Sequence, residues 1–91
     1  MDTTHKADVV QRLKSIGGHV GGIIRMAEDD AYCIDLIQQI QAVHGALDKV
    51  SGLVLDSHLK SCVTTAIRGE NPADRERVLT EIVGVFQAGR R

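Results

Sequence analysis

Two cysteines and one histidine are the residues of this 91-residue chain with the clearest capacity for chemistry: Cys33, His58 and Cys62. His58 precedes Cys62 by four residues, so on a helix both side chains project from one face, about one turn apart. That separation lets an imidazole and a thiolate bind the same metal ion. The same spacing also occurs where Cys simply packs as a small hydrophobe, so the pair alone leaves both interpretations open.

Cys33 extends this pattern over the length of a helix. It precedes His58 by 25 residues and Cys62 by 29, which is close to seven and eight whole turns, so the three residues share one face. It also lies roughly 40 Å from the pair along a straight helix axis. Two copies packed antiparallel about a two-fold axis near residues 46–48 would bring Cys33 of one chain to the pair of the other. The spacing therefore predicts a homodimer with two identical shared sites.

Two thiolates and one imidazole form a soft ligand set with no evident fourth member. Zinc prefers four ligands in structural sites, whereas sulfur-rich ligands select Cu(I), so three-coordinate Cu(I) is the expected occupant. Thiolates are also oxidisable. Reactive-sulfur chemistry at Cys33 and Cys62 therefore remains an alternative to metal binding.

The elements that position these residues are predicted to be helices throughout one small domain, residues 1–91. Apolar residues make up 43% of the chain and aromatic residues only 2%, so the core is aliphatic and small, and self-association would extend it. The apolar residues recur at helical spacing, with no convincing alternating strand. The fold class is therefore all-α.

Three helices are expected. The first covers about residues 4–27. The second runs as one rod from about residue 30 to 68, with the acidic residues 28–30 suited to its start and Gly69 as a C-cap. The third starts at Asn71, as N-cap, and Pro72. The apolar stripes of the first two helices are Val9, Val10, Leu13, Ile16, Val20, Ile23 and Ile24, and then Leu36, Ile40, Val43, Leu47, Val50 and Val54.

Charge and targeting signals narrow the functional class. The net charge is −1, yet residues 6–25 hold four basic residues against one acidic residue. No secretory signal or membrane-spanning segment is readable, so a cytoplasmic location and no membrane partner are expected. An enzyme is not expected, because the chain shows neither a C-x-x-C motif nor a nucleophile–base pair.

Several short motifs together resemble the copper-sensing operon repressor family, CsoR, over about residues 6–87. They are Arg12-Leu13-Lys14-Ser15-Ile16-Gly17-Gly18-His19, Gly22-Ile23-Ile24-Arg25-Met26, Asp30-Ala31-Tyr32-Cys33, Gln39-Ile40 and His58-Leu59-Lys60-Ser61-Cys62. The resemblance implies a three-helix protomer with a long second helix, an antiparallel four-helix-bundle dimer and a disc-like tetramer. It further implies a repressor that binds operator DNA and releases it when Cu(I) binds, derepressing copper-resistance genes.

Family branches that sense nickel, cobalt, formaldehyde or persulfides differ at the ligand positions. Cys62 is unlike the nickel and formaldehyde branches, and His58 is unlike the persulfide branch, so Cys33, His58 and Cys62 together match the copper branch. A persulfide-responsive repressor using Cys33 and Cys62 is the alternative.

The resemblance also assigns residues outside the ligand set. Tyr32 and Glu81 match an outer shell around the metal, and Arg12, Lys14 and Lys49 match basic positions that contact DNA. A histidine near the N-terminus contributes ligands in the nickel branch. Here His5 is interpreted instead as a flexible surface residue.

Overall fold

Helical periodicity governs the whole described chain. The structure, a computed structural model, describes residues 3–88, with side chains for all of these except residues 62 and 63. No strand occurs within that range. The helices are α1 (Thr3–Glu28), α2 (Cys33–His58), the π-helix η1 (Leu59–Val63), α3 (Thr64–Arg68) and α4 (Pro72–Ala88).

The predicted all-α fold with three helices is confirmed by this element order. α1 is the first expected helix, α4 is the third, and α2, η1 and α3 follow one another without a gap where one long second helix was expected. The chain divides into two compact units, one ending at Leu55 and one starting at Asp56. The single-domain organisation stays a prediction. No described helix is long and apolar enough to cross a membrane.

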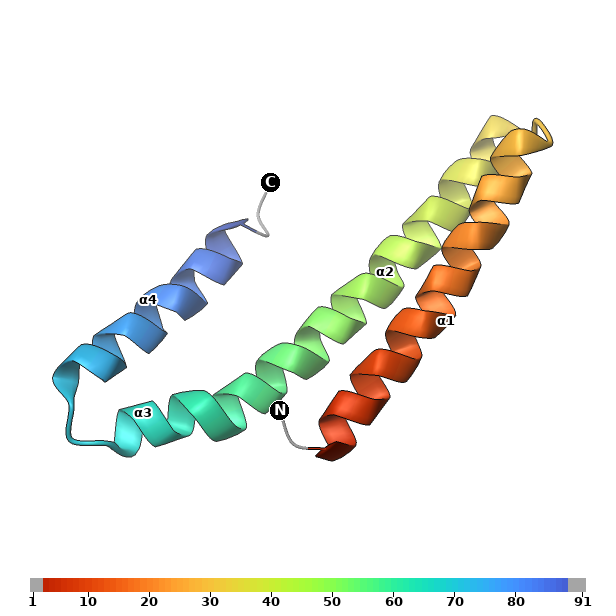
Figure 1. Ribbon diagram of the computed structural model, residues 1–91. Helices are drawn as coiled ribbons and strands as arrows, with labels where there is room; N and C mark the ends of the chain where they lie inside the picture. Colours follow the sequence, from red (N-terminus) through yellow and green to blue (C-terminus); the bar gives the residue numbers. More distant parts are fainter. Residues whose placement is uncertain (1–2, 89–91) are drawn as a thin grey trace. The chain divides into compact units, whose positions relative to one another are not determined.

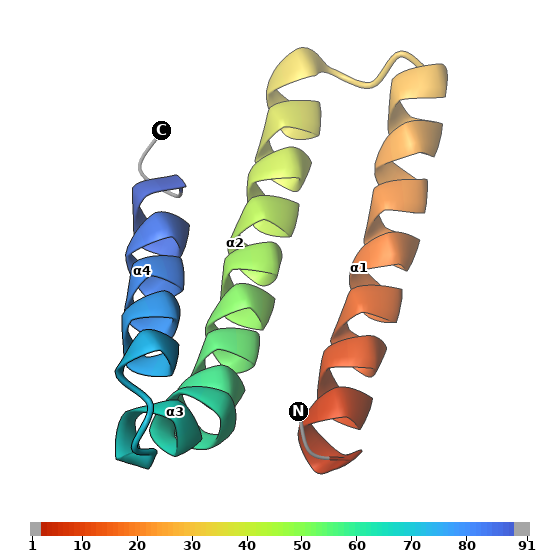
Figure 2. The same cartoon turned by 60° about the vertical axis from the view of Figure 1, so that its left-hand side comes forward.

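The first unit is an antiparallel hairpin of α1 and α2, which lie side by side in both views (Figures 1 and 2). His19 and Gln39 link the two helices, with 2.8 Å between the imidazole Nε2 and the amide Oε1. This contact joins side chains 20 residues apart in the sequence. It fixes the register of one helix against the other.

Apart from Val10 and Ile24, which are exposed, each apolar stripe of the hairpin divides into two series with a seven-residue repeat. One series is buried or half-buried in the single chain and the other is between 37% and 44% exposed. The covered series are Val9, Ile16 and Ile23 on α1 and Leu36, Val43 and Val50 on α2. The open series are Leu13 and Val20 on α1 and Ile40, Leu47 and Val54 on α2.

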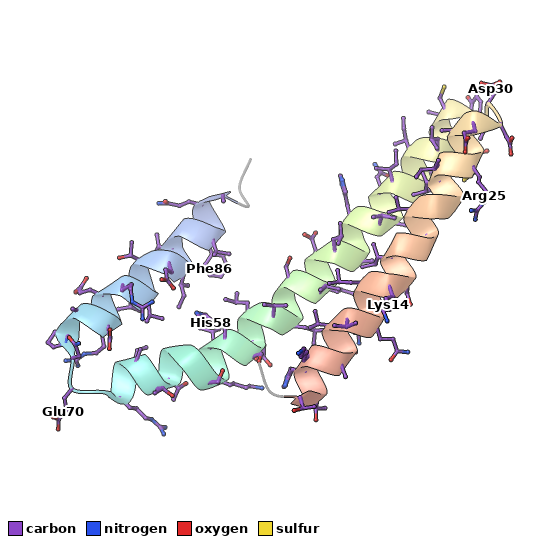
Figure 3. All side chains as sticks on the ribbon, in the orientation of Figure 1. Lys14, Arg25, Asp30, His58, Glu70 and Phe86 are labelled. Carbon is purple, nitrogen blue, oxygen red and sulfur yellow. The ribbon has the colours of Figure 1, made fainter. Side chains whose placement is uncertain are left out.

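The turn between α1 and α2 differs from the prediction. Asp30 has a φ of 58°, in the left-handed region. The N–H of Asp30 bonds the carbonyl of Ala27 at 3.2 Å, and that of Ala31 bonds Met26 at 2.9 Å, which is a Schellman ending of α1. The acidic residues 28–30 therefore finish the first helix, and the prediction that they start the second is wrong. Figure 3 shows Asp30 at this tip.

In the second unit, α4 packs against η1 and α3, and Val78 of α4 is its buried apolar residue among those described. Asn71 caps α4 as expected, because its side-chain Oδ1 accepts a hydrogen bond from the Ala73 N–H at 3.0 Å. Gly69 follows the end of α3 without a left-handed φ. A Cβ there would lie 3.3 Å from the Thr65 carbonyl oxygen, so glycine at the expected C-cap provides space.

Candidate metal ligands and nucleic-acid interface

Tyr32 and Cys33 form the N-terminus of α2. The Tyr32 carbonyl accepts the first helical hydrogen bond, from the Leu36 N–H at 3.1 Å, so Tyr32 is the N-cap and Cys33 the first helical residue. The Cys33 thiol is free and exposed, and Tyr32 is 69% exposed. Both side chains are therefore open to a ligand or to another chain.

His58 and Cys62 lie where regular α-helix gives way to π-helix. His58, labelled in Figure 3, is half-buried and ends α2 with φ −63° and ψ −44°. It directly precedes η1, which contains Cys62. The Cys62 side chain lies outside the described residues. A π turn closes on the fifth residue rather than the fourth, so the backbone positions of His58 and Cys62 are still about one turn apart. The prediction that Cys33, His58 and Cys62 share one face was made for α-helical winding throughout, and it stays a prediction.

The candidate ligands are divided between the two units, since Cys33 belongs to the first and His58 and Cys62 to the second. Among the side chains that the structure describes, no three of His, Cys, Asp and Glu are arranged to hold a metal ion. A shared site formed with a second chain stays a prediction.

Glu81, the second outer-shell candidate, lies on α4 in the second unit. Its Oε1 accepts a hydrogen bond from the Arg77 guanidinium at 3.1 Å, and both side chains are at least half exposed. Arg77 lies 4.0 Å from Asp74 as well. Glu81 is therefore one end of a charged row along α4, formed by Asp74, Arg77 and Glu81. The sequence indicates this row only through the three- and four-residue spacing of its members.

Two of the three predicted DNA-binding residues come together in the first unit. Arg12 of α1 and Lys49 of α2 line one open groove of about 670 Å³ between the helices. Asp8 holds the Arg12 side chain through an ion pair of 2.9 Å between its Oδ1 and the Arg12 Nε. The full lining is Asp8, Gln11, Arg12, Ser15, Ile16, Ala42, Gly45, Ala46, Lys49 and Val50.

Lys14 lies beside a different hollow. That hollow, of about 520 Å³, is lined by residues of α1: Thr3, Lys6, Ala7, Val10, Gln11 and Lys14. Figure 3 labels Lys14 on this helix. The three predicted DNA-binding cations thus divide into a pair in one groove and a third residue on the surface of α1.

Two residues were missed or misread from the sequence. Asp8 was not assigned a role, although its position one turn before Arg12 is the spacing of a helical ion pair. His5 was interpreted as a flexible surface residue, but it lies within α1 and is half-buried.

Comparison with known proteins decides the family. Residues 5–88 match the model of a family described as metal-sensitive transcriptional repressors. The chain belongs to this family. The description is that of a repressor rather than an enzyme, as expected.

Curated relatives carry copper-sensing names. The copper-sensing transcriptional repressor CsoR of Mycobacterium tuberculosis is 43% identical over 71% of this chain, and the match spans 55% of that relative's length. RicR, a copper-sensing repressor of the same organism, is 46% identical over 77% of this chain and 73% of its own length. CsoR of Bacillus subtilis is 39% identical over 90% of this chain and 78% of its own length.

Solved structures show the same fold within the family. The copper-sensing repressor CsoR with Cu(I) from Geobacillus thermodenitrificans superposes with a TM-score of 0.88 and 34% identity, covering 100% of this chain and 92% of that one. The nickel-responsive regulator InrS has a TM-score of 0.76 and 35% identity, covering 88% and 90%. A variant of the formaldehyde-responsive regulator FrmR from Salmonella enterica gives 0.78 and 28%, covering 96% of each. The fold is thus common to regulators named for different signals.

Proposed function

We propose that this protein is a Cu(I)-responsive transcriptional repressor of the cytoplasm. It binds operator DNA without metal and releases it when Cu(I) binds, derepressing copper-resistance genes. The observation that carries the proposal is the soft donor set of Cys33, His58 and Cys62 in a member of the metal-sensitive repressor family. The copper-sensing names of several relatives support it.

These ligands fit Cu(I) by their chemistry. The Cys33 thiol is exposed and unpaired with another cysteine, and the half-buried His58 imidazole offers a nitrogen donor. Sulfur and imidazole donors in a set of three suit Cu(I) better than zinc. Bound Cu(I) would supply a link between these donors. Cys33 of one chain and His58 and Cys62 of the partner subunit would hold it.

The open apolar series supports the second chain that such a site needs. Leu13, Ile40 and Leu47 are all at least 40% exposed in the single chain, although they recur at the spacing of a buried helix face. An apolar face of this extent usually marks an association surface. We assign it to the four-helix-bundle dimer, with dimers pairing into a tetramer.

The groove between α1 and α2 is the proposed contact with operator DNA. Arg12 and Lys49 present cations from two helices, and the small residues Gly45 and Ala46 allow a sugar–phosphate backbone to approach. Backbone phosphates provide much of the affinity in protein–DNA complexes, and several symmetry copies of this groove would add their contributions. Lys14 extends the basic surface along α1.

Tyr32 and Glu81 are the proposed outer shell. Residues around a metal ligand set its orientation and transmit its occupancy to other elements. Tyr32 adjoins Cys33 in the chain, and Glu81 is held on α4 by Arg77. A metal-dependent change of partner at Glu81 would therefore alter the charged row of α4.

The exposed Cys33 thiol supports one competing function, a persulfide-responsive repressor in which Cys33 and Cys62 of opposing chains join through sulfur. Mass spectrometry and a DNA-binding measurement, both after treatment with persulfide, distinguish the copper sensor from the persulfide sensor. A copper sensor keeps its affinity for DNA after mild persulfide treatment, whereas a persulfide sensor forms a crosslinked dimer that no longer binds DNA.

The proposed function is tested by fluorescence anisotropy on labelled DNA from upstream of the protein's own operon, without oxygen and at one salt concentration. We expect tight binding by the metal-free protein. One equivalent of Cu(I) per chain should weaken it by about 5- to 150-fold, the usual range for allosteric coupling. Equal affinity with and without Cu(I) would refute the proposal. Zn(II) at the same concentration is the control and should leave the affinity unchanged.

A further inference from the structure

The helix changes its winding at the residues that carry two of the candidate ligands. α2 ends at His58, the next five residues are π-helical, and regular α-helix resumes at Thr64. π-helical turns are rare and often occur at functional sites. The π-helical segment is Leu59–Val63, which contains Cys62, and the flanking residues His58 and Thr64 have α-helical backbone angles.

Thr64 stabilises this winding with its side chain. Its hydroxyl Oγ1 donates to the Leu59 carbonyl at 2.6 Å, and its backbone N–H is directed to the Leu59 and Ser61 carbonyls. In an α-helix a threonine hydroxyl reaches the carbonyl three or four residues back. Here it reaches five residues back, and this bond favours π winding over α winding.

Ser61 adds a second hydroxyl contact in the same segment. Its Oγ donates to the carbonyl of the buried Ser57 at 2.7 Å, a back-bond of the type that bends helices. The two hydroxyl donors, Ser61 and Thr64, flank Cys62 in the chain, and their two acceptor carbonyls, on Ser57 and Leu59, flank His58.

The winding decides where the Cys62 backbone lies relative to His58. In an α-helix the fourth residue stands about 40° past a full turn. In a π turn, which closes on the fifth residue, the fourth residue falls short of a full turn. We propose that the hydroxyls of Thr64 and Ser61 are positioning groups, which hold the π turn and thereby set the spacing of His58 and Cys62 for a shared metal ion.

This inference rests on the proposed function, and its test separates the two. Thr64→Val removes the hydroxyl and keeps the branched shape, whereas Thr64→Ser keeps the hydroxyl. Thr65→Val is the matched control, since Thr65 is the adjacent exposed residue on α3. Cu(I) affinity is measured for each variant by competition with a chelator, together with the near-ultraviolet Cu(I)–thiolate absorption.

We expect Thr64→Val to bind Cu(I) about 10- to 100-fold more weakly, the usual cost of losing a group that orients a metal ligand. Its charge-transfer absorption should also shift, and Thr64→Ser and Thr65→Val should match the unmodified protein. Ser61→Ala should show a smaller loss in the same direction. Unchanged affinity and absorption in Thr64→Val would overturn the inference while leaving the copper site intact.

Crystal structures of the metal-free protein and of Thr64→Val provide a readout that does not depend on copper. We expect the Thr64 N–H to bond the Leu59 carbonyl in the unmodified protein and the Lys60 carbonyl in the variant. If the π turn persists in Thr64→Val, the hydroxyl does not hold it and the inference fails. If the winding changes but the unmodified protein binds no Cu(I), the metal-positioning role and the proposed function fail together.

Discussion

The two units of this chain obey different rules of helix construction. The hairpin of α1 and α2 is regular, with seven-residue apolar series, a left-handed turn at Asp30 and a side-chain link between His19 and Gln39. The unit from Asp56 onward contains the π turn. Among its described side chains, Val78 and Ser57 are less than 5% exposed. Regular α-helical winding keeps the open apolar series of α1 and α2 on one face of each helix, as an association surface requires. A local π turn instead changes the position of one candidate ligand residue relative to the next.

The largest expected effect comes from breaking the regular unit's open apolar series. Leu47→Glu places a charge on a surface that we assign to the dimer, and burying an unpaired charge costs several kcal/mol. We expect loss of the dimer and tetramer, and with them of DNA binding, measured by analytical ultracentrifugation and anisotropy. Ser51→Glu, on the same helix but outside the series, is the control and should assemble normally. Intact tetramers in Leu47→Glu would place the interface elsewhere.

The basic groove of the hairpin predicts a smaller, salt-dependent effect. Arg12→Ala should weaken operator binding about tenfold or more and lower the slope of log affinity against log salt by about one per lost phosphate contact. Cu(I) binding should not change. Arg75→Ala removes one positive charge from α4 and is the matched control. An equal loss of DNA and Cu(I) binding in Arg12→Ala would indicate misfolding rather than a lost phosphate contact.

The coupling between the two units is expected to depend on Tyr32 and Glu81. Tyr32→Phe and Glu81→Gln should retain Cu(I) and bind DNA normally when metal-free. Each should reduce the Cu(I)-induced loss of DNA affinity several-fold. The coupling free energy between Cu(I) and DNA binding in the unmodified protein is expected to be about 1 to 3 kcal/mol. The measurement is operator affinity of metal-free and Cu(I)-loaded variants at one salt concentration. If both variants keep the full ratio, the outer-shell proposal is wrong, although the ligand set can still stand.

The smallest effect concerns the link that holds the hairpin in register. Gln39→Ala removes the acceptor of the His19 contact and should lower the free energy of unfolding by about 1 kcal/mol. Chemical denaturation at a fixed protein concentration measures it, since assembly adds to stability. Gln38→Ala, an exposed neighbour, should cost less. Equal stabilities would mean that the His19–Gln39 contact does not contribute to folding.

Much of the fold was predictable because it depends on local patterns. Apolar spacing predicted all three helices, and Asn71 followed by Pro72 predicted the start of α4. The end of α1 was predicted to within one residue, but the left-handed turn at Asp30 was not, because acidic residues favour a helix N-terminus and also tolerate that conformation. The helix ends at Gly69 as expected, and glycine there avoids crowding against the Thr65 carbonyl rather than adopting a left-handed φ.

The candidate site was predictable in its residue types and less so in its backbone. The resemblance to the family assigned Arg12 and Lys49 to DNA contact, but neither spacing nor charge predicted that they line one groove. The π turn was not predictable, because serine and threonine also occur within ordinary α-helices, so the residue types of Ser61 and Thr64 do not reveal the contacts that they make there. The pairing of Asp8 with Arg12 has the spacing of many surface ion pairs, so spacing alone did not single it out.

The most direct test of the shared copper site is complementation between two defective chains. Cys33→Ala and Cys62→Ala protomers are purified as a mixed dimer carrying two different affinity tags, and Cu(I) is titrated without oxygen. Each variant alone should lose tight binding, because each removes one ligand from both sites. The mixed dimer should recover one tight site per two chains, since one of its two sites regains all three ligands. No recovery in the mixed dimer, or tight binding by either variant alone, would contradict a site shared between chains.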